Sequence, residues 1–294
     1  MNGLLRVLVA IGVVAASGAA FLYWQDPKRD IPATPIPADP VTPPSPVATP
    51  RPRFPIPVPS PEEATREPVT GTSPDAELTP PPAEDVPREP LPALNESTRP
   101  ITEVLSGMFT AETLNAVFNT EEFVRRFVLT VDTLPNAKLP RQNLLFKRVP
   151  GAFQVDGTGE ERVIAAANAQ RYAPYVQLAQ RIETQRLVNI YQRFYPLFQE
   201  AYVELGNPNA YFNDRVVEVI DHLLDTPAVD APLRVVQLKV FFQYADPELE
   251  RLSAGQKALL RMGSANAAQI KAKLREVRAA LTGSGGEPGS GPAE

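Results

Sequence analysis

The chain has 294 residues, 43% of them hydrophobic, and 23 of its 34 prolines lie between residues 26 and 100, so a packed domain is expected only after that stretch. It has no cysteine, which excludes a disulfide framework, a thiolate zinc site, an iron–sulfur cluster, a lipoprotein anchor and cysteine catalysis. The net charge of −5 is concentrated in residues 62–96, and the nearly neutral second half argues against a nucleic-acid partner, because phosphate binding requires a basic surface.

Residues 1–25 are predicted to form a transmembrane anchor. No charge interrupts the chain from Val7 to Trp24, and 18 helical residues span about 27 Å, close to the hydrocarbon thickness of a bilayer. Contact with lipid is expected through residues 4–24. The alternative is a cleaved signal peptide, with small residues at 16–20, although the apolar run continues beyond them. Positive charges on both sides leave the orientation undecided.

Residues 26–93 are predicted to be a disordered proline-rich linker. Proline at nearly every second or third position removes backbone donors and favours polyproline II, a solvated and extended conformation. Within it, "PRPRFPIP" resembles a ligand for aromatic-lined proline grooves, beside the plainer interpretation of a spacer alone.

Residues 94–282 are predicted to form a helical globular domain, followed by a flexible tail at 283–294. Apolar residues recur at helical spacing over 123–134, 184–205, 216–224 and 267–281. Predicted N-terminal caps are Asn119 with Glu122, Asn213, Asp246, Ser253 with Gln256, and Ser264.

Two stretches have strand character. Residues 153–155 and 162–164 flank "DGTGEE" and predict a small hairpin. Val235 to Tyr244 alternates apolar and polar residues, which favours a strand, and a helix there stays open. The predicted fold class is mainly α: a multi-helix globular domain with a minor β-hairpin or small sheet, after an N-terminal transmembrane helix and a disordered proline-rich linker.

One constellation has residue types suited to chemistry. Asp214, Glu218, Asp221 and His222, the only histidine, share one predicted helix and are the catalytic candidates. Two of the three acids could form a carboxylate pair for glycosidic cleavage. The favoured interpretation is the polar side of a packed helix, with acids toward its N-terminus and the histidine toward its C-terminus. No metal site and no cofactor are predicted, because no second histidine and no phosphate loop or dinucleotide fingerprint is present.

The last helix and its approach are rich in basic residues. A solvated face is the favoured interpretation, with anionic lipid or an acidic partner as the alternative. The residues are Lys257, Arg261, Lys271, Lys273, Arg275 and Arg278.

Four blocks of the chain carry a resemblance to a known family. "RFVLTVDTLP", "RFYPLFQEAYVELG", "YFNDRVVEVIDHLL" and "DPELERLSAGQKALLRMG" resemble a bacterial family catalogued as domain of unknown function 3014. The resemblance implies a proteobacterial source and a membrane-tethered domain. It implies no activity, cofactor or catalytic residue.

These observations predict a single-pass inner-membrane protein whose C-terminal domain lies in the periplasm. Its expected role is non-catalytic, binding or scaffolding an envelope protein or a cell-wall partner. The alternative is an envelope hydrolase that uses acidic residues of the Asn213–Asp225 helix. The oligomeric state is left open.

Overall fold

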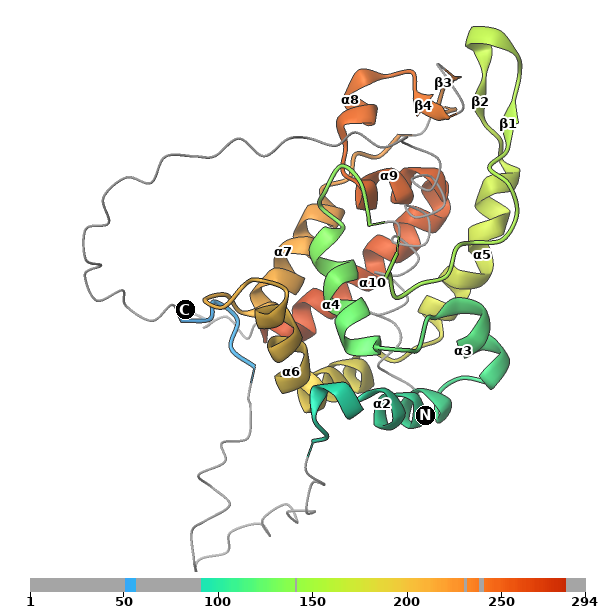
Figure 1. Cartoon of the computed structure of the whole chain (residues 1–294). Coiled ribbons are helices and arrows are strands. Elements are labelled where there is room, and N and C mark those ends of the chain that lie inside the picture. The colour runs from blue at the N-terminus through green and yellow to red at the C-terminus, as the bar shows by residue number, and fades with distance from the viewer. Residues whose placement is uncertain (1–50, 57–90, 141, 230–231, 238–240, 284–294) are drawn as a thin grey trace, which may run out of the picture.

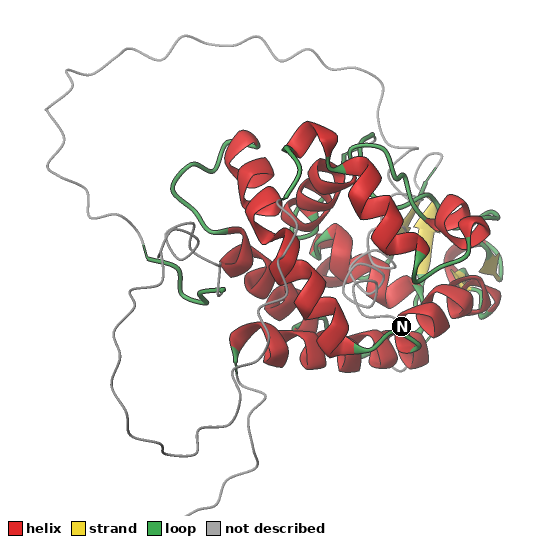
Figure 2. Cartoon of the chain, turned by 90° about the horizontal axis from the view of Figure 1, so that it is seen from below, coloured by secondary structure: helices red, strands yellow, loops and turns green. Residues whose placement is uncertain are grey.

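The computed structural model describes residues 51–56, 91–140, 142–229, 232–237 and 241–283. They form a mainly helical structure with two small antiparallel sheets, which confirms that part of the predicted fold class (Figures 1 and 2). Within these ranges no helix is both long and apolar enough to span a bilayer. The predicted anchor at 1–25, most of the predicted linker and the tail from 284 lie outside the described residues.

The helices form runs with short connections inside each run, and the two hairpins lie between these runs. In chain order the elements are η2 (Leu94–Glu96), α2 (Thr98–Ser106), α3 (Ala111–Val117), α4 (Phe123–Thr133), β1 (Val155–Asp156), η3 (Gly159–Glu161), β2 (Val163–Ile164), α5 (Ala167–Gln180), α6 (Thr184–Glu204), α7 (Phe212–Leu224), β3 (Val235–Gln237), β4 (Phe242–Tyr244), α8 (Pro247–Arg251), α9 (Ala254–Arg261) and α10 (Ser264–Thr282).

Helices α10 and α4 organise the packing. Helix α10 contacts α5, α6, α7 and α9, and α4 lies against α6 and α7. In Figure 1, α10 runs between α5 and α7. The apolar stripes predicted for 123–134, 184–205, 216–224 and 267–281 therefore meet in one core, which explains why these helices form despite their differing lengths.

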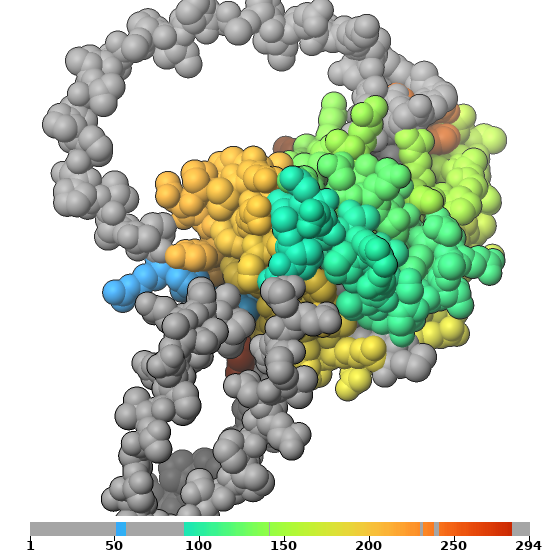
Figure 3. Space-filling view, turned by 60° about the horizontal axis from the view of Figure 1, so that its bottom comes forward, coloured from blue at the N-terminus to red at the C-terminus, as the bar shows by residue number. Residues whose placement is uncertain are grey.

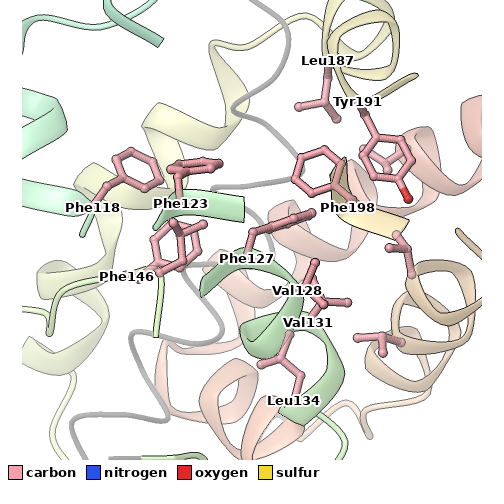
Figure 4. Close-up of a cluster of buried hydrophobic side chains, with 14 of the residues drawn as sticks. Phe118, Phe123, Phe127, Val128, Val131, Leu134, Phe146, Leu187, Tyr191 and Phe198 are labelled. Carbon is pink, nitrogen blue, oxygen red and sulfur yellow. The ribbon is translucent and has the colours of Figure 1, made fainter. Parts of the chain in front are cut away.

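Aromatic rings fill the centre of this core. The Phe127 ring meets the Phe198 ring edge-on at 5.0 Å between centroids and the Phe212 ring at 5.8 Å. A second group joins Phe118 to Phe146 at 5.0 Å (Figure 4). Edge-on and tilted pairs of this kind stabilise a core beyond the area that they bury. Phe212 is the first residue of α7 and is fully buried, so its ring fixes the start of that helix in the core.

The two hairpins differ in how well the sequence predicts them. Strands β1 and β2 pair Val155 with Ile164, which confirms the hairpin around "DGTGEE". Residues 235–244 are neither one strand nor a helix: β3 and β4 pair Val235 with Tyr244, and residues 238–240 between them lie outside the described residues. Val235 and Tyr244, at the two ends of the stretch, are both buried and lie opposite each other in the pair of strands.

Two of the predicted caps are confirmed as helix caps with side-chain hydrogen bonds. Ser253 and Gln256 form a reciprocal capping box on α9, and Asp246 accepts from the Glu248 N–H. The prediction that Ser264 caps α10 is wrong: Ser264 is the first helical residue, and the cap position is taken by Gly263 (φ 86°), where a positive φ favours glycine.

The prediction for Asn119 is wrong. Helix α4 begins at Phe123 after a left-handed Glu122 (φ 49°), with no side-chain cap. The Asn119 amide instead donates to the Leu144 carbonyl at 2.9 Å, because residues around Phe146 run alongside and offer a long-range partner.

The favoured interpretation of a solvated basic face is also wrong for three members. Lys257, Arg261 and Lys273 are buried. The Lys257 ammonium lies 2.9 Å from a Glu250 carboxylate oxygen, and Lys273 pairs with Glu276. A buried cation needs such a partner, since an unpaired one would be strongly destabilising.

Candidate functional site

Helix α7 carries all four polar candidates, and the structure directs them to three different neighbours. Asp214 and Glu218 meet the segment formed by residues 51–56, which the structure places against the domain although it is more than 150 residues away in sequence (Figures 1 and 3). Asp221 faces α10, and His222 faces the start of α9. The four residues therefore do not form one centre.

The Asp214 carboxylate binds the backbone of segment 51–56 through both of its oxygens. The Arg53 N–H donates to Oδ2 at 2.9 Å, and the Phe54 N–H donates to Oδ1 at 2.8 Å. Pro52 and Pro55 have no N–H, so this one carboxylate takes both backbone donors that Pro52–Pro55 offers. Hydrogen bonds to a charged acceptor are among the stronger ones in proteins.

Asn213 completes the backbone recognition. Its side-chain amide donates to the Phe54 carbonyl at 2.8 Å. Asn213 is therefore not the N-cap that its position predicts: Tyr211 is the cap residue of α7 and makes no side-chain cap hydrogen bond. The prediction fails because Asn213 is already the second residue of the helix and its amide binds a distant segment.

The side chains of segment 51–56 alternate between the domain and solvent. Phe54 and Ile56 are half-buried and pack against the hydrophobic core, whereas Arg53 and Pro55 are exposed. The Arg53 guanidinium pairs with the Glu218 carboxylate. Both side chains of that pair are about half exposed, so the pair contributes only about 0–1 kcal/mol to the free energy of docking. It influences which residue is preferred at position 53 more than it strengthens the contact.

We call the part of the domain that contacts segment 51–56, at the start of α7, the receptor side. It is held in place by hydrogen bonds within the domain. The Arg215 guanidinium donates to the Asp132 carboxylate and to the Asp132 carbonyl, both at 2.8 Å, which ties α7 to α4. Gln199 of α6 accepts from the Phe212 N–H at 2.8 Å and donates to the Ala210 carbonyl at 2.8 Å. None of these contacts involves segment 51–56.

Two tyrosines of α6 lie close to this end of α7. Burial raises the pKa of Tyr195 to about 12 and the pKa of Tyr191 well above its ordinary value, and the Asp214 charge acts in the same direction on both. Among the described residues, Tyr191 Oη and Asn213 Oδ1 are the buried side-chain polar atoms with no hydrogen-bond partner. Such atoms are uncommon in folded proteins, and one of the two, Asn213 Oδ1, belongs to a residue that contacts segment 51–56.

Asp221 and His222 tie α7 to its neighbours. The Asp221 carboxylate pairs with the Arg278 guanidinium of α10, and this hydrogen bond raises the pKa of Arg278. His222 Nε2 lies 2.8 Å from Ser253 Oγ, and the Gln256 side-chain amide donates to the His222 carbonyl at 3.1 Å. Ser253 is buried and already accepts from the Gln256 N–H, so the histidine and serine join two helices.

Other features of the described residues lie elsewhere. No group of three or more histidine, aspartate and glutamate side chains there could hold a metal ion. A cavity of about 410 Å³ lies among α5, α9, α10 and residues 226–229, 232 and 233. On its wall the Lys271 ammonium donates to the Thr226 carbonyl. None of the four candidate residues lines it.

The environment of His222 predicts a pH effect on stability. Burial is the largest influence and lowers the pKa of His222 below its ordinary value of 6.5. The unfolded chain therefore binds the proton more readily, and the free energy of unfolding should fall as the pH drops through 6.5 toward the folded pKa. Urea unfolding at pH 7.5 and 5.5 should show a larger loss for the wild type than for His222→Asn. Equal losses would contradict the assignment.

The family described as "Protein of unknown function (DUF3014)" matches residues 123–278. No curated protein and no solved structure matches the chain. The matched range begins at α4 and ends within α10, so it contains α7 and the whole receptor side of the contact with segment 51–56, while the segment itself lies outside it. Because the match covers more than half of the chain, this protein belongs to the DUF3014 family of proteins of unknown function.

Proposed function

We propose that the protein is a membrane-tethered, non-catalytic binding or scaffold protein of the bacterial cell envelope, and that its helical domain grips an extended peptide segment. The observation that carries the proposal is the contact of both Asp214 oxygens with successive backbone N–H groups of Arg53 and Phe54. A carboxylate used in this way is a fixed acceptor for a peptide backbone. The bound segment belongs to the chain's own proline-rich stretch.

The envelope location is supported by the layout of the sequence. An uncharged run over residues 7–24 precedes a proline-rich stretch at 26–93, which is an arrangement suited to holding a domain away from a bilayer. We place the anchor in the inner membrane, in contact with lipid through residues 4–24, and the domain in the periplasm. Its partner there is an envelope protein or a cell-wall component.

The hydrolase alternative requires a carboxyl group free to carry a proton beside a substrate. Asp214 holds two backbone N–H groups, Glu218 pairs with Arg53, and Asp221 pairs with Arg278. No observation favours this alternative over peptide binding, and it stays a prediction.

The gripping of segment 51–56 can be measured because the chain has no cysteine of its own. Spin labels on Arg51→Cys and Lys138→Cys, both exposed positions, should give one narrow distance distribution in the full chain. Asp214→Ala removes two charge-assisted hydrogen bonds of about 1.5–3 kcal/mol each, so the docked population relative to the free one should fall at least tenfold and the distribution should broaden.

Asp225→Ala is the matched control, since Asp225 is an exposed aspartate at the other end of the same helix. It should leave the distribution narrow. Circular dichroism checks that both variants keep their helices. A distribution that Asp214→Ala does not change would refute the proposed grip.

The proposed location has its own test. A reporter enzyme that is active only in the periplasm, fused after residue 294, should be active in cells that express the full chain. Activity of the matching reporter that works only in the cytoplasm would place the domain on the other side of the membrane.

A further inference from the structure

We propose that the surface of α7 that holds segment 51–56 is a recognition site for a peptide of another protein, and that the chain's own segment occupies it until that peptide displaces it. The ligand is an extended peptide with an arginine followed by an aromatic residue, flanked by prolines. This inference rests on the proposed function and names the partner class of the same site.

The recognition is confined to a short stretch of the ligand. The backbone contacts are made by Arg53 and Phe54, the ion pair by Arg53, and the apolar packing by Phe54 and Ile56. None of these contacts depends on the connection through residues 57–90. A separate chain with the same residues can therefore make every one of them.

The receptor surface is assembled before the ligand arrives. Arg215 is fixed on Asp132, and Gln199 holds the start of α7, in both cases without help from the segment. The prolines of the ligand fix their own backbone angles in the extended region, which lowers the entropy lost on binding. A preformed site and a stiff ligand together suit recognition of a short peptide.

The chemistry of the site selects the class of peptide. Asp214 requires two successive backbone N–H groups, which excludes proline at the positions of Arg53 and Phe54. The negative charges of Asp214 and Glu218 favour arginine and disfavour an acidic residue at the first position. The apolar surface beneath Phe54 favours an aromatic residue at the second.

The displacing peptide comes from another protein. If two copies of this chain exchanged their segments 51–56, neither would gain binding free energy. Two copies that swapped their segments would make the same contacts and would lose the effective concentration, on the order of mM, that a direct covalent connection provides. A different protein can add contacts of its own. Displacement would lengthen the stretch between anchor and domain from residues 26–50 to residues 26–93, from at most about 80 Å to at most about 210 Å when extended.

The test uses the full chain with its own segment disabled by Arg53→Ala and Phe54→Ala, which leaves the receptor residues intact. A fluorescently labelled peptide of residues 50–57, PRPRFPIP, should bind this variant at least tenfold more tightly than it binds the wild type, where the site is occupied. Adding Asp214→Ala to the variant should weaken binding at least tenfold, and adding Asp225→Ala should not.

Matched peptides test the selectivity. Arg53→Ala in the peptide should weaken binding about two- to fivefold, as expected for an exposed ion pair, whereas Arg51→Ala, with the same composition, should not. Phe54→Ala should weaken it more than tenfold.

Two results would overturn the inference, and both differ from a failure of the proposed function. The first is that the peptide does not bind the disabled variant although the spin labels show the wild-type segment docked. The site would then hold only the chain's own segment, and the proposed grip would stand. A wild-type dimer in light scattering that Asp214→Ala dissociates would assign the site to a second copy. If Asp214→Ala does not release the segment, the proposed function itself fails.

Discussion

The fold and the proposed function meet in the Asp214 carboxylate. It sits in the first turn of α7, where the helix dipole favours a negative charge, and its two oxygens accept the two N–H groups that lie between Pro52 and Pro55. The carboxylate can accept both hydrogen bonds only if α7 keeps its position relative to the rest of the domain. That condition is met by Phe212 in the aromatic core and by Arg215 on Asp132. The buried face of α7 thus supplies the rigidity that its outer face uses.

The polar residues of helix α7 connect it to several neighbours. Its polar residues point successively to segment 51–56, to Arg278 of α10 and to Ser253 of α9, and each meets a group of complementary charge or hydrogen-bonding character. The location of a charged residue on a helix says little about its role until its partner is known. Here the partners differ along the helix: Asp214 meets segment 51–56, whereas His222 meets Ser253 within the domain.

The sequence predicts the parts of this structure that depend on neighbouring residues. Helical periodicity places α4, α6, α7 and α10, and local rules predict the capping box of Ser253. Helix α5 is missed, because its apolar residues do not form one stripe and Pro174 lies inside it. The partner of His222 is also missed, since nothing near position 222 points to Ser253. The only signal in the sequence was the predicted capping role of Ser253 at the start of α9, the second helix after α7.

Both halves of the candidate site are visible in the sequence, but their pairing is not. "PRPRFPIP" has the character of a peptide ligand, and Asn213, Asp214 and Glu218 form a polar set on one helix. About 160 residues separate Phe54 from Asp214, and no periodicity or local rule links positions so far apart. The same limit explains the error at Asn213, where a local preference for capping was overridden by a bond to the distant Phe54 carbonyl.

Amide hydrogen exchange of Arg51, Arg53 and Phe54, followed by NMR in the full chain, tests the central claim most directly. The account predicts that the Arg53 and Phe54 amides exchange at least tenfold more slowly than in an unstructured chain, because Asp214 accepts both, while the Arg51 amide is unprotected. Exchange of all three amides at the unprotected rate would show that segment 51–56 is not held by α7 and would contradict the account.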